Sequence, residues 1–435
     1  MGSSVKLFSF EYQKVSLVDH DELQQYVVRL QQEVERVSST RLSEYETNYA
    51  SINLPRDKKN IECVKKVIAQ KKKLEPSVMV VVGIGGSNLG TIAVQEALFG
   101  RFYNEHIPET KVYFADTVDT DYLWDIVLLV EQELEAGKNI LLNVVSKSGT
   151  TTETIANFEL FLELLKRYKK EDWYEHVVVT TDQGSMLWKW AVEYNVIVLA
   201  IPKIVGGRYS VFSAVGLFPL GMMNVAIEQL CTGAESVIDS CIGAGDTNIA
   251  AVRAVLLFAQ YKKNIPIHDL FLFSVDLKSI GRWYRQLMAE SLGKDGKGLM
   301  PTISIGSTDL HSMAQLYLGG PNNRFTTFVT IEKSKSNIVL PTFDDFEKLV
   351  ANIQGIPVSS IMQAIFNSVY TVYKKQQLPF CSITLPEKSA FYVGQLLQTM
   401  MMEIMYLGFL FGVNPFDQPH VQLYKKETRK LLAER

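Results

Sequence analysis

NILLNVVSKSGTTTETIANFELFLELLKRYKK, residues 139–170, is the stretch of this sequence that decides the fold. Its opening apolar run, NILLNVV, is typical of a short strand that is buried on both faces of a parallel sheet. From residue 154 onward the apolar residues recur at helical spacing, which indicates an amphipathic helix. A buried strand followed directly by such a helix is the repeating unit of a parallel α/β sheet.

Similar units continue on both sides of this stretch. Short apolar runs separated by helical segments lie at residues 78–82, 111–116, 176–182 and 195–202. A long apolar segment at 209–230, predicted to be helical, is followed by further runs at 269–275, 302–306, 324–332 and 379–386. We therefore expect an α/β fold of two domains, each with a mainly parallel sheet between helices, and a boundary near residues 205–235.

The composition is that of a globular protein with no preference for nucleic acid. The chain has 435 residues, of which 47% are hydrophobic and 21% charged, and its formal net charge is −3. This balance argues against a nucleic-acid-binding protein with a basic face. The basic run KKVIAQKKK at 65–73 is interpreted as a solvated helix face. Glu403 interrupts the longest apolar stretch, which favours a buried helix over a membrane span.

The cysteines and the N-terminal residues indicate a cytoplasmic protein. None of the four cysteines belongs to a CxxC pair, and the six histidines add no metal-ligand spacing. We therefore predict structural thiols in a reducing compartment and no metal site. The N-terminal sequence MGSSVKLFSFEYQKV lacks the apolar core of a signal peptide. Apolar residues at helical spacing predict an exposed helix within residues 1–45.

A glycine-rich loop, VVGIGGSNLGT, follows the first apolar run at residues 81–91. Its glycines allow a tight turn and a close approach of the backbone to a ligand, and a helix is expected to begin near Ser87 or Asn88. A tight turn without a ligand is the alternative. A nicotinamide-dependent dehydrogenase is disfavoured because Asn88 stands where the third glycine of GxGxxG is required.

The hydroxyl cluster SKSGTTTET, at residues 146–154, lies between a predicted strand and a predicted helix. Hydroxyl groups and free backbone N–H groups at a helix N-terminus form a cradle for an anion, and Lys147 adds positive charge. A helix cap is the alternative, but one capping side chain would suffice for it. No Walker lysine pattern is present. We therefore predict a site for the phosphate group of a small metabolite.

Four other residues belong to motifs that carry charge to predicted loops or helix ends. Arg208 follows two glycines, which suits a close approach to negative charge, although a surface turn is equally consistent. Glu290 lies near the C-terminal end of a helix predicted to end at Gly293, where the dipole disfavours negative charge; this suits a proton acceptor. His311 and Lys425 are a candidate proton shuttle and a helix lysine, with packing and solvent exposure as alternatives.

Five motifs in order resemble the glucose-6-phosphate isomerase family in its shorter bacterial form. They read GIGGSNLG, SKSGTTTET, VGGRYS, AESLGKDGKG with STDLHS, and FDQPHVQLYKK, and the resemblance covers roughly residues 78–430. It implies two sugar-isomerase (SIS) domains of the αβα three-layer type, in a homodimer. It also implies interconversion of glucose 6-phosphate and fructose 6-phosphate without metal or organic cofactor. The domains would be 46–215 and 216–435, with helical extensions at residues 1–45 and at the C-terminus.

The resemblance also implies a role for each matching residue. Glu290 would be the base that moves a proton between C2 and C1, and Arg208 would lie beside the cis-enediolate. His311, reaching in from the neighbouring subunit, and Lys425 would open the sugar ring. The substrate would be bound by Gly86, Ser87, Ser146, Lys147, Ser148, Thr151 and Gln286.

Two departures from the family pattern and one rival function remain. His420 replaces a glycine and Gln422 replaces a glutamate of the last motif, changes that can shift the helix that carries Lys425 and alter the charge near it. Pro419 is expected as the first residue of that helix. The rival is a non-catalytic regulator that binds a phosphosugar through SIS domains. It would be expected to carry a DNA-binding module, and the first 45 residues contain no helix-turn-helix pattern.

Overall fold

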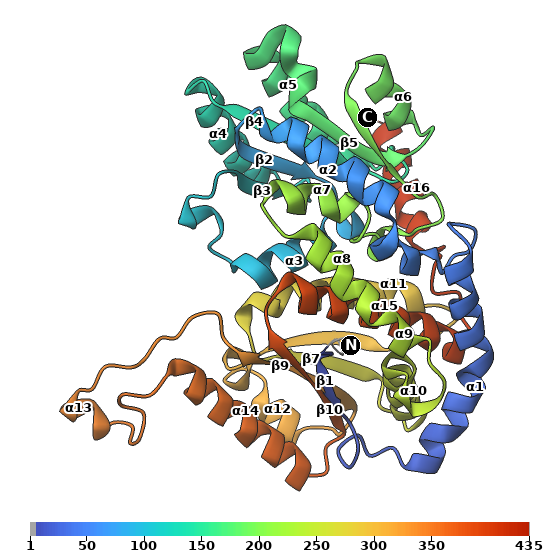
Figure 1. Ribbon diagram of the computed structural model, residues 1–435, viewed down its shortest axis with the longest axis vertical. Coiled ribbons are helices and arrows are strands. Elements are labelled where there is room, and N and C mark those ends of the chain that lie inside the picture. The colour runs from blue at the N-terminus through green and yellow to red at the C-terminus, as the bar shows by residue number, and fades with distance from the viewer. Residues whose placement is uncertain (1–5, 435) are drawn as a thin grey trace, which may run out of the picture.

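The computed structural model describes residues 6–434 and contains two five-stranded sheets (Figure 1). The first sheet has the strand order β3-β2-β4-β5-β6, and all its neighbouring strands are parallel. Its strands are β2 (Pro76–Val82), β3 (Lys111–Ala115), β4 (Asn139–Val145), β5 (Val177–Asp182) and β6 (Ile197–Ile201). The chain reverses its direction of travel across the sheet between β2 and β4, so the carboxyl ends of these two strands flank the crevice where ligands bind in such sheets.

The second sheet has the order β1-β10-β9-β7-β8 and is parallel except for β1, which pairs antiparallel with β10. Its strands are β1 (Ser9–Glu11), β7 (Ile267–Leu272), β8 (Met300–Ile305), β9 (Arg324–Lys333) and β10 (Phe380–Glu387). The predicted α/β class with mainly parallel sheets is confirmed. Each predicted strand is present with boundaries shifted by a few residues, whereas β1 was not predicted.

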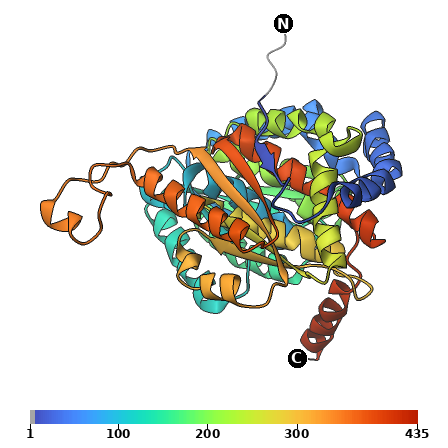
Figure 2. The ribbon, with the colours of Figure 1, turned by 90° about the horizontal axis from the view of Figure 1, so that it is seen from below.

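Helices cover both faces of each sheet, as Figures 1 and 2 show. The helices are α1 (His20–Ser39), α2 (Lys58–Lys72), α3 (Leu89–Phe99), α4 (Thr120–Glu135), α5 (Thr152–Lys169), α6 (Met186–Glu193), α7 (Ala214–Met222), α8 (Ile227–Ser236), α9 (Ile238–Cys241), α10 (Ile249–Lys262), α11 (Lys278–Leu292), α12 (Ala314–Gly319), α13 (Asp344–Glu347), α14 (Val358–Lys375), α15 (Ala390–Phe411) and α16 (Val421–Ala433). Within residues 6–434, no helix is long and apolar enough to cross a membrane.

One large core joins the two sheets. In β2, Met79 and Val81 face this core, whereas Val78, Val80 and Val82 face a second cluster beneath α4, α5 and α6. Successive residues of a strand point to opposite faces, so a continuous apolar run is what a sheet covered on both faces requires. The inner face of the second sheet meets the same core through α10, α11 and α15. The first sheet lies within 46–215; the proposed domain boundaries themselves stay a prediction.

Glu403 lies inside the buried helix that the sequence predicted. It is fully buried in α15, and its Oε2 accepts a hydrogen bond of 2.6 Å from Nε of Arg253 on α10. The hydroxyl group of Tyr284 on α11 donates to the other carboxylate oxygen. A buried carboxylate requires such partners, and this cluster ties three core helices together.

Three local predictions are wrong. The long helix expected at 209–230 is divided into α7 and α8 by a turn at Asn224, whose φ of 64° does not fit a helix. α16 begins at Val421 and not at Pro419. The basic run on α2 is not wholly solvated, because Lys71 is 3% exposed and donates to the carbonyl oxygen of Glu175; burial lowers the pKa of Lys71 to about 8.

Two segments project from the body of the protein. The arm that contains α13, between β9 and α14, extends to one side, and α16 extends at the C-terminal end (Figure 2). Apolar side chains of the arm are exposed, including Phe343 at 55%, Phe346 at 56% and Leu349 at 74%. The helix within 1–45 is α1, which is amphipathic and buries one face against α10 and α15.

Candidate active site

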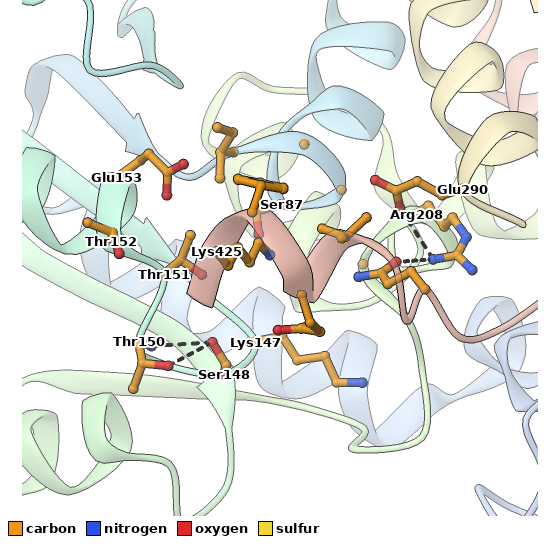
Figure 3. A pocket seen from close by; sticks show the side chains of 18 of the residues that line it. Ser87, Lys147, Ser148, Thr150, Thr151, Thr152, Glu153, Arg208, Glu290 and Lys425 are labelled. Atoms are coloured by element: carbon orange, nitrogen blue, oxygen red, sulfur yellow. Dashed lines mark hydrogen bonds and ion pairs between the residues drawn. The ribbon is translucent and has the colours of Figure 1, made fainter. Parts of the chain in front are cut away.

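A cavity of about 570 Å³ lies at the carboxyl ends of β2 and β4 (Figure 3). Its walls are the glycine-rich loop after β2, the hydroxyl-rich loop after β4, the turn that contains Arg208, one face of α11, and α16. Nine predicted site residues line it: Gly86, Ser87, Lys147, Ser148, Thr151, Arg208, Gln286, Glu290 and Lys425. Segments that are far apart in the sequence therefore meet at the crevice that the strand order creates.

The hydroxyl-rich loop forms the N-terminal end of α5. Thr151 is the N-cap residue of α5 but makes no side-chain capping hydrogen bond, so its hydroxyl group is not used to terminate the helix. Gly149 has a φ of 68°, which turns the chain back toward the cavity. Ser148 accepts hydrogen bonds of 3.3 Å from the backbone N–H and the hydroxyl group of Thr150. Unused hydroxyl and N–H groups at this helix end are suited to bind an anion.

Ser146 differs from the other predicted residues of this loop. It is 2% exposed, it does not line the cavity, and its Oγ lies 3.2 Å from Oγ1 of Thr151. The structure therefore places Ser146 behind Thr151. In this geometry Ser146 orients the threonine hydroxyl group and does not face the cavity itself.

Lys147 and Asp182 bring opposite charges to the floor of the cavity. Burial lowers the pKa of Lys147, and the carboxylate of Asp182 opposes this shift. Burial raises the pKa of Asp182, and the positive charges of Lys147 and Lys203 oppose that shift. An ammonium group that is partly removed from water gains more from an added anion than an exposed one does. The pair is therefore suited to receive a phosphate group.

The glycine-rich loop touches the turn that carries Arg208. A Cβ atom at Gly86 would lie 2.3 Å from the carbonyl carbon of Gly207 and 2.5 Å from the amide nitrogen of Arg208. No other residue fits between two backbones at this distance. Gly86 therefore fixes the position of Arg208 relative to the mouth of the loop, and Ser87 follows it at the cavity wall.

Glu290 and Arg208 form the other side of the cavity (Figure 3). Nη1 of Arg208 lies 3.3 Å from Oε2 of Glu290, and Nε2 of Gln286 donates a hydrogen bond of 3.0 Å to Oε1. The Glu290 side chain is 27% exposed, whereas that of Arg208 is 1% exposed. A buried cation therefore orients a carboxylate that remains accessible from the cavity.

Arg208 is held by protein acceptors on every side. Nε donates to Oγ of Ser291 at 2.8 Å, and Nη2 donates to the carbonyl oxygens of Pro415 and Asp417 at 2.7 and 3.1 Å. Nη1 also donates to Oε1 of Gln418. These acceptors fix the guanidinium group in place before any ligand binds, and a preorganised cation can stabilise negative charge that develops near it.

α16 closes the cavity with Lys425 on its inner face. The helix is poorly buried, and none of its residues belongs to the core. Arg429, one turn further along, donates a hydrogen bond of 3.4 Å to the carbonyl oxygen of Thr150 in the hydroxyl-rich loop. The sequence did not single out Arg429, although its spacing of four residues from Lys425 places both on one helix face.

His311 lies outside this cavity. It follows the 3-10 turn η9 (Thr308–Leu310), is exposed, and is not among the residues that line the site. The structure of a single chain therefore brings together the predicted base, the arginine, the lysine and the hydroxyl loop, but not the predicted histidine.

The comparisons with known proteins agree with this geometry. A model of the family described as phosphoglucose isomerase matches residues 65–313. A glucose-6-phosphate isomerase of Streptococcus mutans is 35% identical over 392 residues, which cover 88% of this chain and 86% of the relative. The chain belongs to the phosphoglucose isomerase family. A glucose-6-phosphate isomerase of Caldanaerobacter subterraneus subsp. tengcongensis is likewise 35% identical, over 88% of this chain and 86% of that protein.

Solved structures extend the likeness to the whole fold. A hypothetical protein from Thermus thermophilus superposes with a TM-score of 0.88 and 29% identity, over 98% of this chain and 100% of that one. A glucose-6-phosphate isomerase from Chlamydia trachomatis superposes with a TM-score of 0.80 at 21% identity, over 99% of this chain and 89% of that one. The second comparison shows the shared fold alone. The predicted family is thereby confirmed.

Within this phosphoglucose isomerase fold, the two departures in the last motif lie at the start of α16. His420 is the N-cap residue of the helix and is exposed, and Gln422 lines the cavity. The sequence reasoning also missed Gln418 and Asp182. Asp182 ends β5, and the carboxyl end of a parallel strand was a usable signal. Gln418 contacts Arg208 from 210 residues away, so no local pattern indicated it.

Proposed function

We propose that this chain interconverts glucose 6-phosphate and fructose 6-phosphate, as an aldose–ketose isomerase of glycolysis and gluconeogenesis. Membership of the phosphoglucose isomerase family supports the reaction. The observation that carries the mechanism is a single cavity with an anion cradle on one side and the Glu290–Arg208 pair on the other (Figure 3). This arrangement suits a small molecule with a phosphate group at one end and a reacting carbon at the other.

The cradle would hold the phosphate group away from the reacting atoms. Lys147, Ser148, Thr151 and the N–H groups at the start of α5 supply the donors, and Ser146 orients Thr151. Binding energy from a remote phosphate group positions the sugar carbons and so lowers the barrier of the chemical step.

Glu290 would move the proton between C2 and C1. A hydrogen on a carbon beside a carbonyl group is a weak acid, so its removal requires a positioned base. Negative charge then develops on oxygen in the cis-enediolate, and the fixed guanidinium group of Arg208 stabilises it. Gln286 donates to Glu290 and would hold the carboxylate oriented while it accepts and returns the proton. Gly86 and Ser87 would contact the sugar.

Ring opening precedes the proton transfer, because the cyclic sugar has no free carbonyl group. We assign this step to Lys425 and to the partner subunit's His311 in a homodimer. The exposed position of His311 outside its own cavity supports a role in a neighbouring one. Mixing inactive His311→Ala and Glu290→Gln chains should then restore activity, because a mixed dimer contains one complete site. Absence of any recovery, with mixed dimers present, would contradict the assignment.

We further propose that the reaction uses no metal ion or organic cofactor and takes place in the cytoplasm. Each step above needs only the side chains named and the substrate. All four cysteines are free, and three of them are buried, which supports a reducing compartment. We also propose two sugar-isomerase domains at 46–215 and 216–435, with helical extensions at 1–45 and at the C-terminus, on the basis of the two sheets.

The test is a coupled assay of the purified protein with fructose 6-phosphate, with and without a metal chelator. Formation of glucose 6-phosphate at the same rate under both conditions is expected. Tight binding of the sugar phosphate with no turnover would instead favour the non-catalytic regulator. Turnover that the chelator abolishes would refute the cofactor-free mechanism while leaving the reaction itself intact.

A further inference from the structure

The active-site cavity continues along α11 into a second, basic cleft. An adjoining cavity shares Gln286 and Glu290 with the active site, and it shares Arg282 and Arg285 with a further cavity of about 450 Å³. We call this last cavity the basic cleft. It lies beside the N-terminal half of α11 and is separated from Glu290 only by the adjoining cavity.

Four cations line the basic cleft. Lys278, Arg282 and Arg285 are spaced at i, i+4 and i+7 and therefore form one stripe on the exposed face of α11. Arg101 joins them from the chain after α3, because α3 packs against α11. The stripe spans about seven residues, or about 10 Å at the rise of an α-helix.

These cations lack partners within the chain. Within residues 6–434, none of the four has a carboxylate oxygen within 4 Å, although exposed arginines elsewhere, such as Arg167 on α5, do form ion pairs. Asp309 is the one acid that lines the basic cleft, and its two oxygens accept hydrogen bonds from its own loop, from the N–H of Ile305 and the hydroxyl group of Ser312.

Stability of the chain does not explain this cluster. Like charges at i and i+4 on a helix destabilise it, so Lys278 and Arg282 lower the stability of α11 rather than raise it. A solvated stripe on a helix would also not account for Arg101, which comes from a different element. Arginine guanidinium groups bind phosphate oxygens in a bidentate manner, which makes a group of three arginines a phosphate-binding surface.

We propose that the basic cleft binds a second ligand, a sugar-sized molecule that carries two phosphate groups. Four cations and one carboxylate leave three uncompensated positive charges, which one phosphate group would not balance. The stripe of about 10 Å allows one phosphate group near Lys278 and the other near Arg285. The N-terminal dipole of α11 adds attraction for the first group. Occupancy next to Gln286 and Glu290 would place this ligand beside the active site without filling it.

Binding at the basic cleft does not depend on the proposed isomerisation, so it is tested by binding alone. The experiment is isothermal titration calorimetry of the full chain with fructose 1,6-bisphosphate in the presence of saturating fructose 6-phosphate. We expect one bisphosphate bound per chain, an affinity at least tenfold lower in Arg101→Ala/Arg282→Ala, and no change in Lys59→Ala/Lys66→Ala. The control variant removes the same charge from exposed positions of α2 that lack ion pairs.

Two further measurements separate the alternatives. Fructose 6-phosphate as the only probe should bind once per chain, because one phosphate group does not span the stripe. Bisphosphate binding that saturating fructose 6-phosphate eliminates, or that the double variant leaves intact, would overturn the proposal. Sedimentation of the Arg101→Ala/Arg282→Ala variant should match that of the unmodified chain. Dissociation of an oligomer would show instead that acidic groups of a second copy occupy the cleft. If the double variant is unfolded by circular dichroism, Arg282→Gln replaces it with the same expectation.

Discussion

Replacing Arg208 with lysine keeps a positive charge beside Glu290 but removes the guanidinium geometry. Arg208 donates to five acceptors: Oγ of Ser291, Oε2 of Glu290, Oε1 of Gln418, and the carbonyl oxygens of Pro415 and Asp417. A lysine ammonium group has three donors, so at least two acceptors would lose their partner. Each buried acceptor left unpaired costs about 1–3 kcal/mol, which gives a loss of about 2–6 kcal/mol in the free energy of unfolding.

The same substitution should also slow the reaction. A misplaced cation no longer stabilises the charge that develops in the transition state, and loss of one fixed donor of this kind lowers kcat by about 10²-fold or more. Urea unfolding measures the first effect, and the coupled assay at saturating substrate measures the second. Arg167→Lys is the matched control, because its ion pairs are exposed and contribute at most about 1 kcal/mol. An Arg208→Lys protein with unchanged stability and unchanged kcat would refute the reasoning.

Three other substitutions test the anion cradle and the core. Lys147→Met should raise KM for the sugar phosphate about tenfold or more, since a charge-assisted hydrogen bond contributes about 1.5–3 kcal/mol; an unchanged KM would contradict this. Burial lowers the pKa of His268 to about 3, so the folded protein keeps it neutral while the unfolded chain protonates below 6.5. Stability should therefore fall by about 1.4 kcal/mol per pH unit between about pH 6.5 and 3, and urea unfolding of His268→Gln should show a flatter pH profile. Glu403→Gln should lose about 3–5 kcal/mol of stability because Arg253 stays buried without its anion, and Arg253→Met/Glu403→Leu should recover most of it.

The elements that the sequence predicted well are those with a local signal. Each of the longer strands is an apolar run, because helices cover both faces of each sheet. β1 has no such run: only three residues long, it has its outer two residues exposed, and its place is set by pairing with β10. The division between α7 and α8 was missed because both helices are largely buried on all sides, and an apolar segment without polar residues does not reveal a turn.

The same distinction applies to the site. The hydroxyl loop and the glycine loop were predictable because short stretches combine with the place of a strand end. The clamp on Arg208 was not, because its acceptors come from a segment about 200 residues away. Ser146 was placed in the site by motif position, and only the packing of the loop shows that it lies behind Thr151.

The most direct test of the account is proton exchange at C2 of the sugar phosphate in heavy water. The Glu290→Gln protein should still bind fructose 6-phosphate but incorporate no deuterium at C2 into glucose 6-phosphate. The Glu153→Gln protein, which changes another carboxylate in the cavity wall, should continue to exchange. Deuterium incorporation by Glu290→Gln at the rate of the unmodified protein would show that another group removes the proton, and the central claim would be wrong.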